Sequence, residues 1–428
     1  MHSASWNVHA LIVFATSMSS RQHSVRTVTL ETGEQLPVLV RRDTGLPLTL
    51  PARWVMRKRR LEVSYNTISN DLYGLADLFD WGEAHFAKRD LPKGDLEQFL
   101  GDGGQLNPSD LDSLVVFVRE RKYKKGSGEM VYRSVQTAAH RIASIQQFLA
   151  WAADPFGRGR RSEENAVSPE ELQAYRSRLK ATFKPFRKVQ GHSTRPDPLT
   201  PEQDELLEDI LSPIGLREGD VSFDRFPAEN SFQPSTRLRN WLLYALLRHH
   251  GLRRGEALKV KVGDVDTVGD PKVRVRRRPN DRDDSRAPAP RVKGMESEVP
   301  LSRTVAHGIK AYMTDFRLSG HRRKGTTYLF TTRRGTPLST SYTTRIFRIL
   351  RKRHPILDGV TPHALRHTWA EEVASHLFEE KGDSEEVISL LREAGRWRPG
   401  STMPQHYVQD AMQSEANRYI KERQNTFD

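Results

Sequence analysis

The chain has 428 residues, which is long enough for two or three domains, each able to bury a core of its own. Its 68 Lys and Arg residues outnumber its 54 Asp and Glu residues, and the net charge of +14 favours a polyanionic partner such as nucleic acid. Cysteine is absent, which excludes disulfides, thiolate metal sites and a cysteine nucleophile and fits a reducing cytosol.

Residues 1–60 are expected to form an arm that is partly strand or disordered. The apolar stretch ALIVFA at 10–15 has no positively charged segment before it and is far shorter than the roughly 20 residues that span a bilayer. We therefore expect a cytoplasmic protein with no secretory signal and no membrane partner. Residues 21–60 mix strand-like pieces with turn signals and contain the basic run RKRR at 57–60.

A small helical domain is predicted for residues 61–155, because apolar residues recur there every three or four positions in three or four segments. Residues 156–197 are basic and marked by Pro and Gly, which predicts a linker with one helix inside it. Thr200, Pro201 and Gln203 then provide an N-cap, a first helical residue and a capping-box partner. A larger domain is expected over residues 198–428.

Arg253 stands directly after the predicted end of a buried helix. Leu238, Trp241 and Leu242 lie on one face of that helix, and Gly251 can end it in the left-handed conformation. Glu256, three residues after Arg253, can orient the guanidinium through a forked ion pair. Taken alone, this is better explained as a surface arginine at a helix junction.

A predicted strand hairpin supplies a lysine. Lys272–Val275 alternate basic residues with valine, and a second strand ends in SEVPLS after an unusually long connection rich in Asp, Arg and Pro. Lys293 stands near the start of this returning strand, where its side chain could reach forward from the hairpin. An isolated lysine in so basic a chain is most often solvated, so only its place in a set makes it a candidate.

The segment TPHALRHTWA at 361–370 combines a helix start with several basic side chains. Pro362 suits the first turn, and His363 and Arg366 lie three residues apart on one helix face, so both can donate toward a common point. His367 points elsewhere and is expected to pack or cap locally. For the pair alone, chance proximity is the more common explanation.

Trp397 and Tyr407 are ten residues apart in GRWRPGSTMPQHY. A buried core residue is the ordinary explanation of a tyrosine near a chain end. Tyr407 is flanked by Gln405, His406 and Gln409 rather than by an apolar run, so we expect it not to be fully buried.

The order of these motifs resembles the catalytic domain of the tyrosine recombinases, also called the phage integrase family. That pattern is an Arg after Gly-Leu with Glu three residues later, a β-hairpin Lys, His-x-x-Arg, a His or Trp, and a Tyr nucleophile. GLRRGEAL, HALRH and GRW match it in order over about 155 residues. The resemblance implies catalytic roles, with Glu256 in support, for Arg253, Lys293, His363, Arg366, Trp397 and Tyr407.

The resemblance also implies a fold and partners. The fold would be mainly α with a small antiparallel β-sheet: a helical, SAM-like core-binding domain at 61–155 and a catalytic integrase domain with a C-terminal tail helix. Double-stranded DNA would be clamped by both domains, with RKRR and the linker contacting phosphates. Four copies would act on two DNA sites of the bacterial nucleoid, with sister recombinases or an accessory factor as further partners. No cofactor and no metal is expected.

In the implied chemistry, Arg253 and Arg366 neutralise the non-bridging oxygens of a phosphodiester attacked by Tyr407. His363 and Trp397 donate further hydrogen bonds, His363 helps remove the phenolic proton, and Lys293 protonates the leaving 5′-hydroxyl. A 3′-phosphotyrosine link results, suited to integration or excision of a mobile element. Two alternatives stay open: DNA relaxation as in type IB topoisomerases, and a non-catalytic DNA-binding regulator.

Overall fold

The computed structural model describes residues 21–86, 96–120, 132–154, 168–187, 197–216, 221–317 and 326–425. The chain divides into unit 1, Met1–His192, and unit 2, Ser193–Asp428. The ALIVFA stretch and the ends of the predicted linker lie outside the described residues. Within the described ranges, no helix combines the length and the apolar character that crossing a membrane requires.

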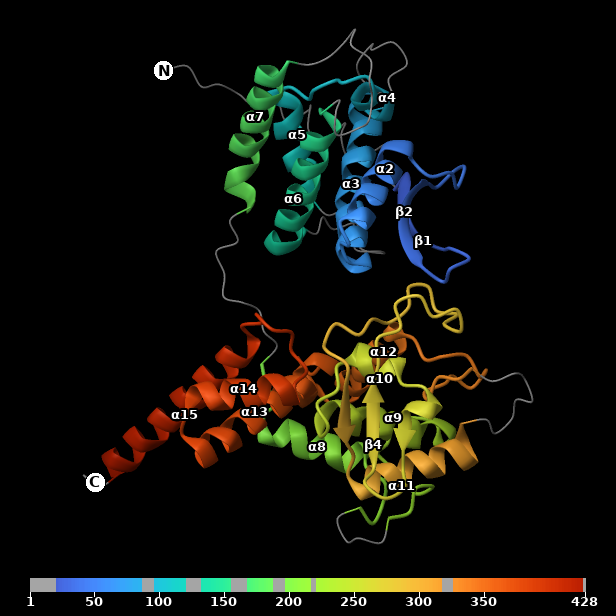
Figure 1. Ribbon diagram of the computed structural model, residues 1–428, viewed down its shortest axis with the longest axis vertical. Coiled ribbons are helices and arrows are strands. Elements are labelled where there is room, and N and C mark those ends of the chain that lie inside the picture. Colours follow the sequence, from blue (N-terminus) through green and yellow to red (C-terminus); the bar gives the residue numbers. More distant parts are fainter. Residues whose placement is uncertain are drawn as a thin grey trace. The chain divides into compact units, whose positions relative to one another are not determined.

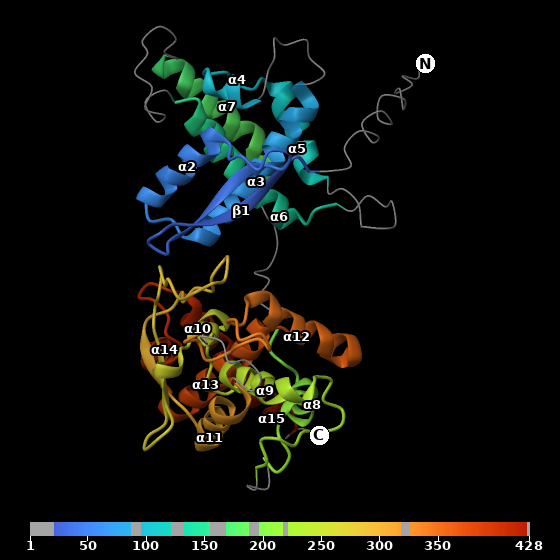
Figure 2. The ribbon, with the colours of Figure 1, turned by 90° about the vertical axis from the view of Figure 1, so that its right-hand side faces the viewer.

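Unit 1 combines a strand hairpin with packed helices (Figure 1). Its described elements are β1 (His23–Thr29), β2 (Gln35–Arg41), α2 (Thr49–Arg60), α3 (Tyr65–Phe86), α4 (Leu96–Gly101), α5 (Pro108–Arg119), α6 (Val135–Ala152) and α7 (Pro169–Arg187). The two strands pair antiparallel, from His23 with Arg41 to Thr29 with Gln35. Helix α3 lies at the centre, in contact with both strands and with α6 (Figure 2).

The core of unit 1 extends beyond the predicted helical domain in both directions. Leu39 on β2 and Trp54 on α2 are buried in it, so the expected arm is part of the packed unit from its first strand onward. Helix α7 buries Tyr175, Leu179 and Phe183, which are spaced four residues apart and form one apolar stripe. The helix predicted inside the linker is therefore a core helix of unit 1.

Unit 2 is mainly helical with a three-stranded antiparallel sheet of order β3-β4-β5. Its described elements are α8 (Pro201–Leu211), α9 (Pro234–Arg248), α10 (Arg254–Lys259), β3 (Val265–Asp266), β4 (Lys272–Val275), β5 (Ser297–Pro300), α11 (Arg303–Ala311), α12 (Thr340–Arg353), α13 (Pro362–Lys381), α14 (Ser384–Ala394) and α15 (Met403–Asn425). The predicted hairpin is confirmed, with Val273 opposite Val299. So is the fold class, mainly α with a small antiparallel sheet.

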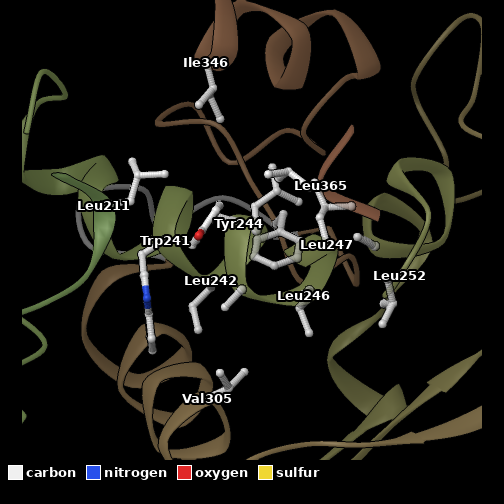
Figure 3. Close-up of a cluster of buried hydrophobic side chains, with 14 of the residues drawn as sticks. Leu211, Trp241, Leu242, Tyr244, Leu246, Leu247, Leu252, Val305, Ile346 and Leu365 are labelled. Atoms are coloured by element: carbon white, nitrogen blue, oxygen red, sulfur yellow. The ribbon is translucent and has the colours of Figure 1, made fainter. Parts of the chain in front are cut away.

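Helix α9 is the centre of the larger core in unit 2 and is buried nearly all round. Trp241, Leu242 and Leu246 point from it into the cluster that Figure 3 shows, together with Val305 of α11 and Leu365 of α13. Such a helix is fixed by packing on every side, which makes its end a rigid starting point for the residues that follow.

Two helix ends in unit 2 follow the sequence predictions. The capping box of α8 is confirmed, since the Gln203 amide donates to the Thr200 hydroxyl at 3.3 Å and the Thr200 amide donates to the Gln203 side chain at 3.2 Å. Gly251, after α9, has φ of +58°. A Cβ there would come within 2.2 Å of the Trp369 ring, so glycine is required both by conformation and by space.

Candidate active site

Arg253 occupies the N-cap position of α10, where Glu256 holds it by two contacts. The Arg253 backbone amide donates to Glu256 Oε2 at 2.9 Å, and Arg253 Nη1 donates to Glu256 Oε1 at 2.8 Å. The predicted ion pair is therefore present, but it joins one guanidinium nitrogen and the main chain to the carboxylate instead of forming a fork. Glu256 is buried, and Arg253 keeps about a fifth of its side chain exposed.

Arg366 reaches the same place from α13, which begins after the N-cap Thr361 with Pro362 in its first turn. Arg366 is buried and donates to the carbonyl oxygens of Gly251 and, at 2.5 Å, Gly395. Arg253 Nη1 also donates to the Gly395 carbonyl, at 3.1 Å. The two guanidinium groups, 113 positions apart in the chain, thus meet at one oxygen atom.

Trp397 lies against both arginines. Its ring centroid is 4.9 Å from Cζ of Arg366 and 5.5 Å from Cζ of Arg253, within the range of a cation–π contact. The same ring lies 5.7 Å from the ring of Tyr407. The indole therefore joins the two cationic groups to the tyrosine.

Tyr407 lies on α15 and is only 2% exposed, so the prediction of incomplete burial is wrong. Its ring packs 4.9 Å from that of His367, and Val408 and Ala411 of α15 are buried in the same cluster. Gln409, on another side of the helix, is exposed. Polar sequence neighbours of a helical residue point to other faces, so they say little about its burial. Tyr407 also interacts electrostatically with Arg366.

His363 faces the site from the exposed side of α13. Reduced solvation, followed by the positive charges of Arg366, Arg253 and Lys293, lowers the pKa of His363 from its ordinary value. Its imidazole is consequently neutral at pH 7 and has a nitrogen able to accept a proton. The neighbouring His367 packs, as predicted, with its ring between those of His363 and Tyr407.

Lys293 is exposed on the connection between β4 and β5. The next residue, Gly294, packs so closely that a Cβ on it would lie 2.6 Å from Arg253 Nη1 and 2.5 Å from the Arg396 carbonyl oxygen. The Met295 amide donates to that same carbonyl at 3.1 Å. The main chain beside Lys293 is thereby held against the arginines.

The long connection that carries Lys293 is itself anchored by buried charges. Arg286 donates through Nε and Nη2 to Asp284 at 2.7 and 2.9 Å, and Lys259 donates to Asp284 at 2.8 Å. Although burial by itself would raise the pKa of Asp284, its bonds with Arg286 and Lys259 lower it to about 2. The length of this connection therefore corresponds to an ordered, ion-paired structure.

Arg396 is the residue of this site that the sequence did not reveal. It is buried and pairs with Glu256, donating to Oε2 from Nε and from Nη2, each at 3.2 Å. Burial by itself would raise the pKa of Glu256, but the charges of Arg396, Arg366 and Arg253 outweigh this and hold it below its ordinary value. Three guanidinium groups face one carboxylate, a combination suited to an added anion.

All six candidate residues belong to unit 2, and the structure links each of them to at least one other. Ring contacts and shared acceptors join Arg253, Arg366, Trp397 and Tyr407, whereas His363 and Lys293 are linked to the arginines through charge. A tyrosine beside two guanidinium groups, a neutral imidazole and an ammonium group has the parts needed for nucleophilic attack on a phosphate ester.

Comparison with known proteins shows which family the region around this site is similar to. Residues 228–414 match the model of the phage integrase family. Tyrosine recombinase XerD of Mycobacterium tuberculosis (strain H37Rv) is 31% identical over 159 residues, which are 37% of this chain and 45% of the relative. XerD of Staphylococcus saprophyticus is 26% identical over 253 residues, 58% of this chain and 73% of the relative. The chain thus matches less than half the length of the first of these relatives.

A solved structure shares the fold. The XerH site-specific recombinase bound to difH substrate, in a pre-cleavage complex, is 16% identical with a TM-score of 0.50, covering 85% of this chain and 82% of that one. The family match includes every residue from Arg253 to Tyr407. By this match and by the XerD relatives, residues 228–414, which hold the whole site, are similar to the phage integrase family of tyrosine recombinases.

Proposed function

We propose that the protein is a site-specific DNA recombinase that cuts and rejoins strands through a tyrosine-linked intermediate. The observation that carries this proposal is the shared Gly395 carbonyl, toward which Arg253 and Arg366 both donate, with the Trp397 ring between them and Tyr407. A phosphate oxygen in that position would be neutralised by two guanidinium groups next to a phenol.

In the proposed step, the phenolic oxygen of Tyr407 attacks phosphorus, and the bond from phosphorus to the 5′-oxygen breaks. The phenolic proton passes to neutral His363, and the Lys293 ammonium group gives a proton to the departing 5′-oxygen. A 3′-phosphotyrosine bond and a free 5′-hydroxyl result. Attack by another 5′-hydroxyl reverses the step and joins new strands with no external energy source.

Tyr407 is buried in the chain by itself, so this mechanism requires its phenol to become accessible when DNA binds. Helix α15 carries the tyrosine, and the turns that follow Tyr407 expose Met412, Tyr419 and Ile420. We assign these turns to contact with a neighbouring copy, in a tetramer on two DNA sites.

Unit 1 would supply phosphate contacts. Two members of the RKRR run are ion-paired, Lys58 with Asp71 at 3.3 Å and Arg59 with Glu34 at 2.7 Å. The other two, Arg57 and Arg60, line a cavity of about 420 Å³ together with Arg53 and other residues of α2 and with Trp151 of α6. We therefore expect Arg53, Arg57 and Arg60 to contribute more to the salt dependence of DNA binding than Lys58 and Arg59.

The test is covalent trapping on nicked duplexes that tile the DNA flanking the gene, where a mobile element would have its ends. A nick beside the scissile phosphate lets the cleaved fragment diffuse away, so the adduct accumulates. We expect an adduct with the native protein and none with Tyr407→Phe, which should still bind. Binding without any adduct would support a regulator instead.

A second assay separates recombination from relaxation. Plasmids carrying two copies of the trapped site should exchange the segment between them, whereas a supercoiled plasmid without the site should stay supercoiled. Relaxation of any plasmid with no exchange would overturn site-specific recombination in favour of topoisomerase activity.

A further inference from the structure

Arg396 is held in an uncommon backbone conformation at the end of α14. Its φ is +55°, in the left-handed region that costs a residue with a side chain free energy. Several hydrogen bonds offset this cost: Nη2 donates to the Gly251 carbonyl at 2.6 Å and Nη1 to the Ala394 carbonyl at 2.9 Å, in addition to the pair with Glu256. The side chain is 3% exposed, and its Nε, Nη1 and Nη2 each donate to an oxygen of the protein.

Two of the three partners of the Arg396 side chain, Glu256 and the Gly251 carbonyl, are each shared with one of the two candidate catalytic arginines. Glu256 also accepts from Arg253, and the Gly251 carbonyl also accepts from Arg366. The carbonyl of Arg396 itself accepts from Arg253 Nη1 at 3.3 Å and from the Met295 amide at 3.1 Å. Arg396 therefore touches the groups that fix both guanidinium groups and the main chain two residues beyond Lys293.

We infer that Arg396 is a positioning residue that holds Arg253 and Arg366 for the scissile phosphate and keeps their charge available to it. This inference rests on the proposed function. Three guanidinium groups against one carboxylate leave a formal charge of +2 in this cluster. Because Arg396 pairs with Glu256, that carboxylate is only partly available to neutralise Arg253 and Arg366.

Loss of Arg396 would change this balance. Glu256 would be left to pair with Arg253 alone, and the two donors that remain would face the phosphate with about one unit of positive charge less. The effect on the reaction should therefore depend on the charge of the phosphate. That dependence distinguishes positioning of the arginines from a contribution to folding alone.

The experiment compares two nicked substrates that carry the trapped site and differ only at the scissile position. One has the ordinary phosphodiester, and the other has a methylphosphonate, in which a methyl group replaces one non-bridging oxygen and removes the negative charge. With the phosphodiester, we expect Arg396→Met to slow adduct formation by about 10- to 100-fold, as for other supporting polar residues. With the methylphosphonate, the loss should be less than about threefold, because little charge is left to stabilise. Arg396→Lys should restore part of the rate on the phosphodiester.

Arg286→Met is the matched control, since Arg286 is also buried in unit 2 and donates to Asp284 and to the carbonyls of Leu258 and Leu338. It should lower both rates by the same factor. If Arg396→Met does the same, the inference is overturned. Should Arg396→Met fail to fold, as judged by circular dichroism and melting, Arg396→Lys is compared on the two substrates with the same criterion. No adduct from the native protein on either substrate would instead refute the proposed function.

Discussion

Replacing Glu256 by glutamine tests whether the buried carboxylate organises the site. Glu256 accepts four hydrogen bonds, at Oε2 from the Arg253 amide and from Nε and Nη2 of Arg396, and at Oε1 from Arg253 Nη1. Glutamine has nearly the same shape but keeps only one acceptor oxygen and turns an NH₂ group toward a donor. Arg253 and the buried Arg366 and Arg396 would then lose the carboxylate that their guanidinium groups share.

The expected loss of stability follows from these contacts. Removing one partner of a buried ion pair costs about 3–5 kcal/mol, and the retained oxygen places this change near the lower end, at about 3 kcal/mol. For a unit of this size, each kcal/mol moves the melting temperature by about 2–4 °C, so unit 2 should melt about 6–12 °C lower. Unit 1 should be unaffected, because the carboxylate belongs to a separate compact unit.

Calorimetry of the full chain is the appropriate assay because it can resolve the transitions of the two units. Glu415→Gln is the matched control, since Glu415 pairs with Arg418 at the exposed surface of α15 and should leave melting unchanged. If both variants melt like the native protein, the carboxylate does not hold the arginines together and the reasoning fails.

The stability that Glu256 provides should also depend on pH in a defined direction. Its pKa in the folded chain lies below its ordinary value: burial opposes this, but the charges of Arg396, Arg366 and Arg253 prevail. The unfolded chain therefore takes up this proton first as the pH falls, so the contribution is complete above about pH 5 and is lost as pH falls through the folded pKa. The difference between native protein and Glu256→Gln should be constant from pH 7 to about pH 5.5 and shrink below about pH 4.5. A difference that grows in acid would contradict the assignment.

Three further outcomes are expected. Reduced solvation and nearby positive charges lower the pKa of His363. The apparent second-order rate of adduct formation should therefore fall in acid, with a midpoint below about pH 6.5. A midpoint at or above that value would refute the role of His363 as a neutral base. Lys293→Ala should slow cleavage of an ordinary substrate but not of one with a 5′-bridging sulfur, since a thiol leaves without a proton donor; equal losses on both would remove Lys293 from that role. Gly359 has φ of +78° and open space around it, so Gly359→Ala should lower the free energy of unfolding in urea by about 1 kcal/mol. Gly251→Ala should lower it by at least about 2 kcal/mol more, because the added Cβ meets the Trp369 ring. Equal losses for the two variants would show that the contact with Trp369 relaxes.

The sequence predicted the elements whose signals are local. The capping box at Thr200, the left-handed Gly251 and the paired strands around Val273 each depend on a few neighbouring residues, and each is present. The six candidate residues were predicted by their order in the chain, which family resemblance makes informative. Their roles in the reaction are predictions that the trapping experiments above address.

What the sequence did not predict depends on contacts between distant segments. Burial of Tyr407 comes from His367 and Trp397, which lie on other segments and leave no trace in the residues beside the tyrosine. Arg396 gave no signal either, because an arginine after glycine near a helix end is usually solvated. Only the fold brings it to Glu256, 140 positions earlier. Helix α7 was placed in a linker because its polar residues outnumber its apolar stripe.

The carbonyl of Gly395 already satisfies a donor on each of the two arginines. A phosphate oxygen bound in its place would replace the Gly395 carbonyl as the acceptor for both arginines. Because the number of hydrogen bonds stays the same, the exchange by itself gains little free energy. The phosphate oxygen carries a full negative charge, whereas the Gly395 carbonyl oxygen carries only the partial charge of a peptide dipole. The two arginines consequently distinguish ligands by charge more than by shape, and an uncharged mimic of the same outline would have almost no advantage over the protein's own backbone.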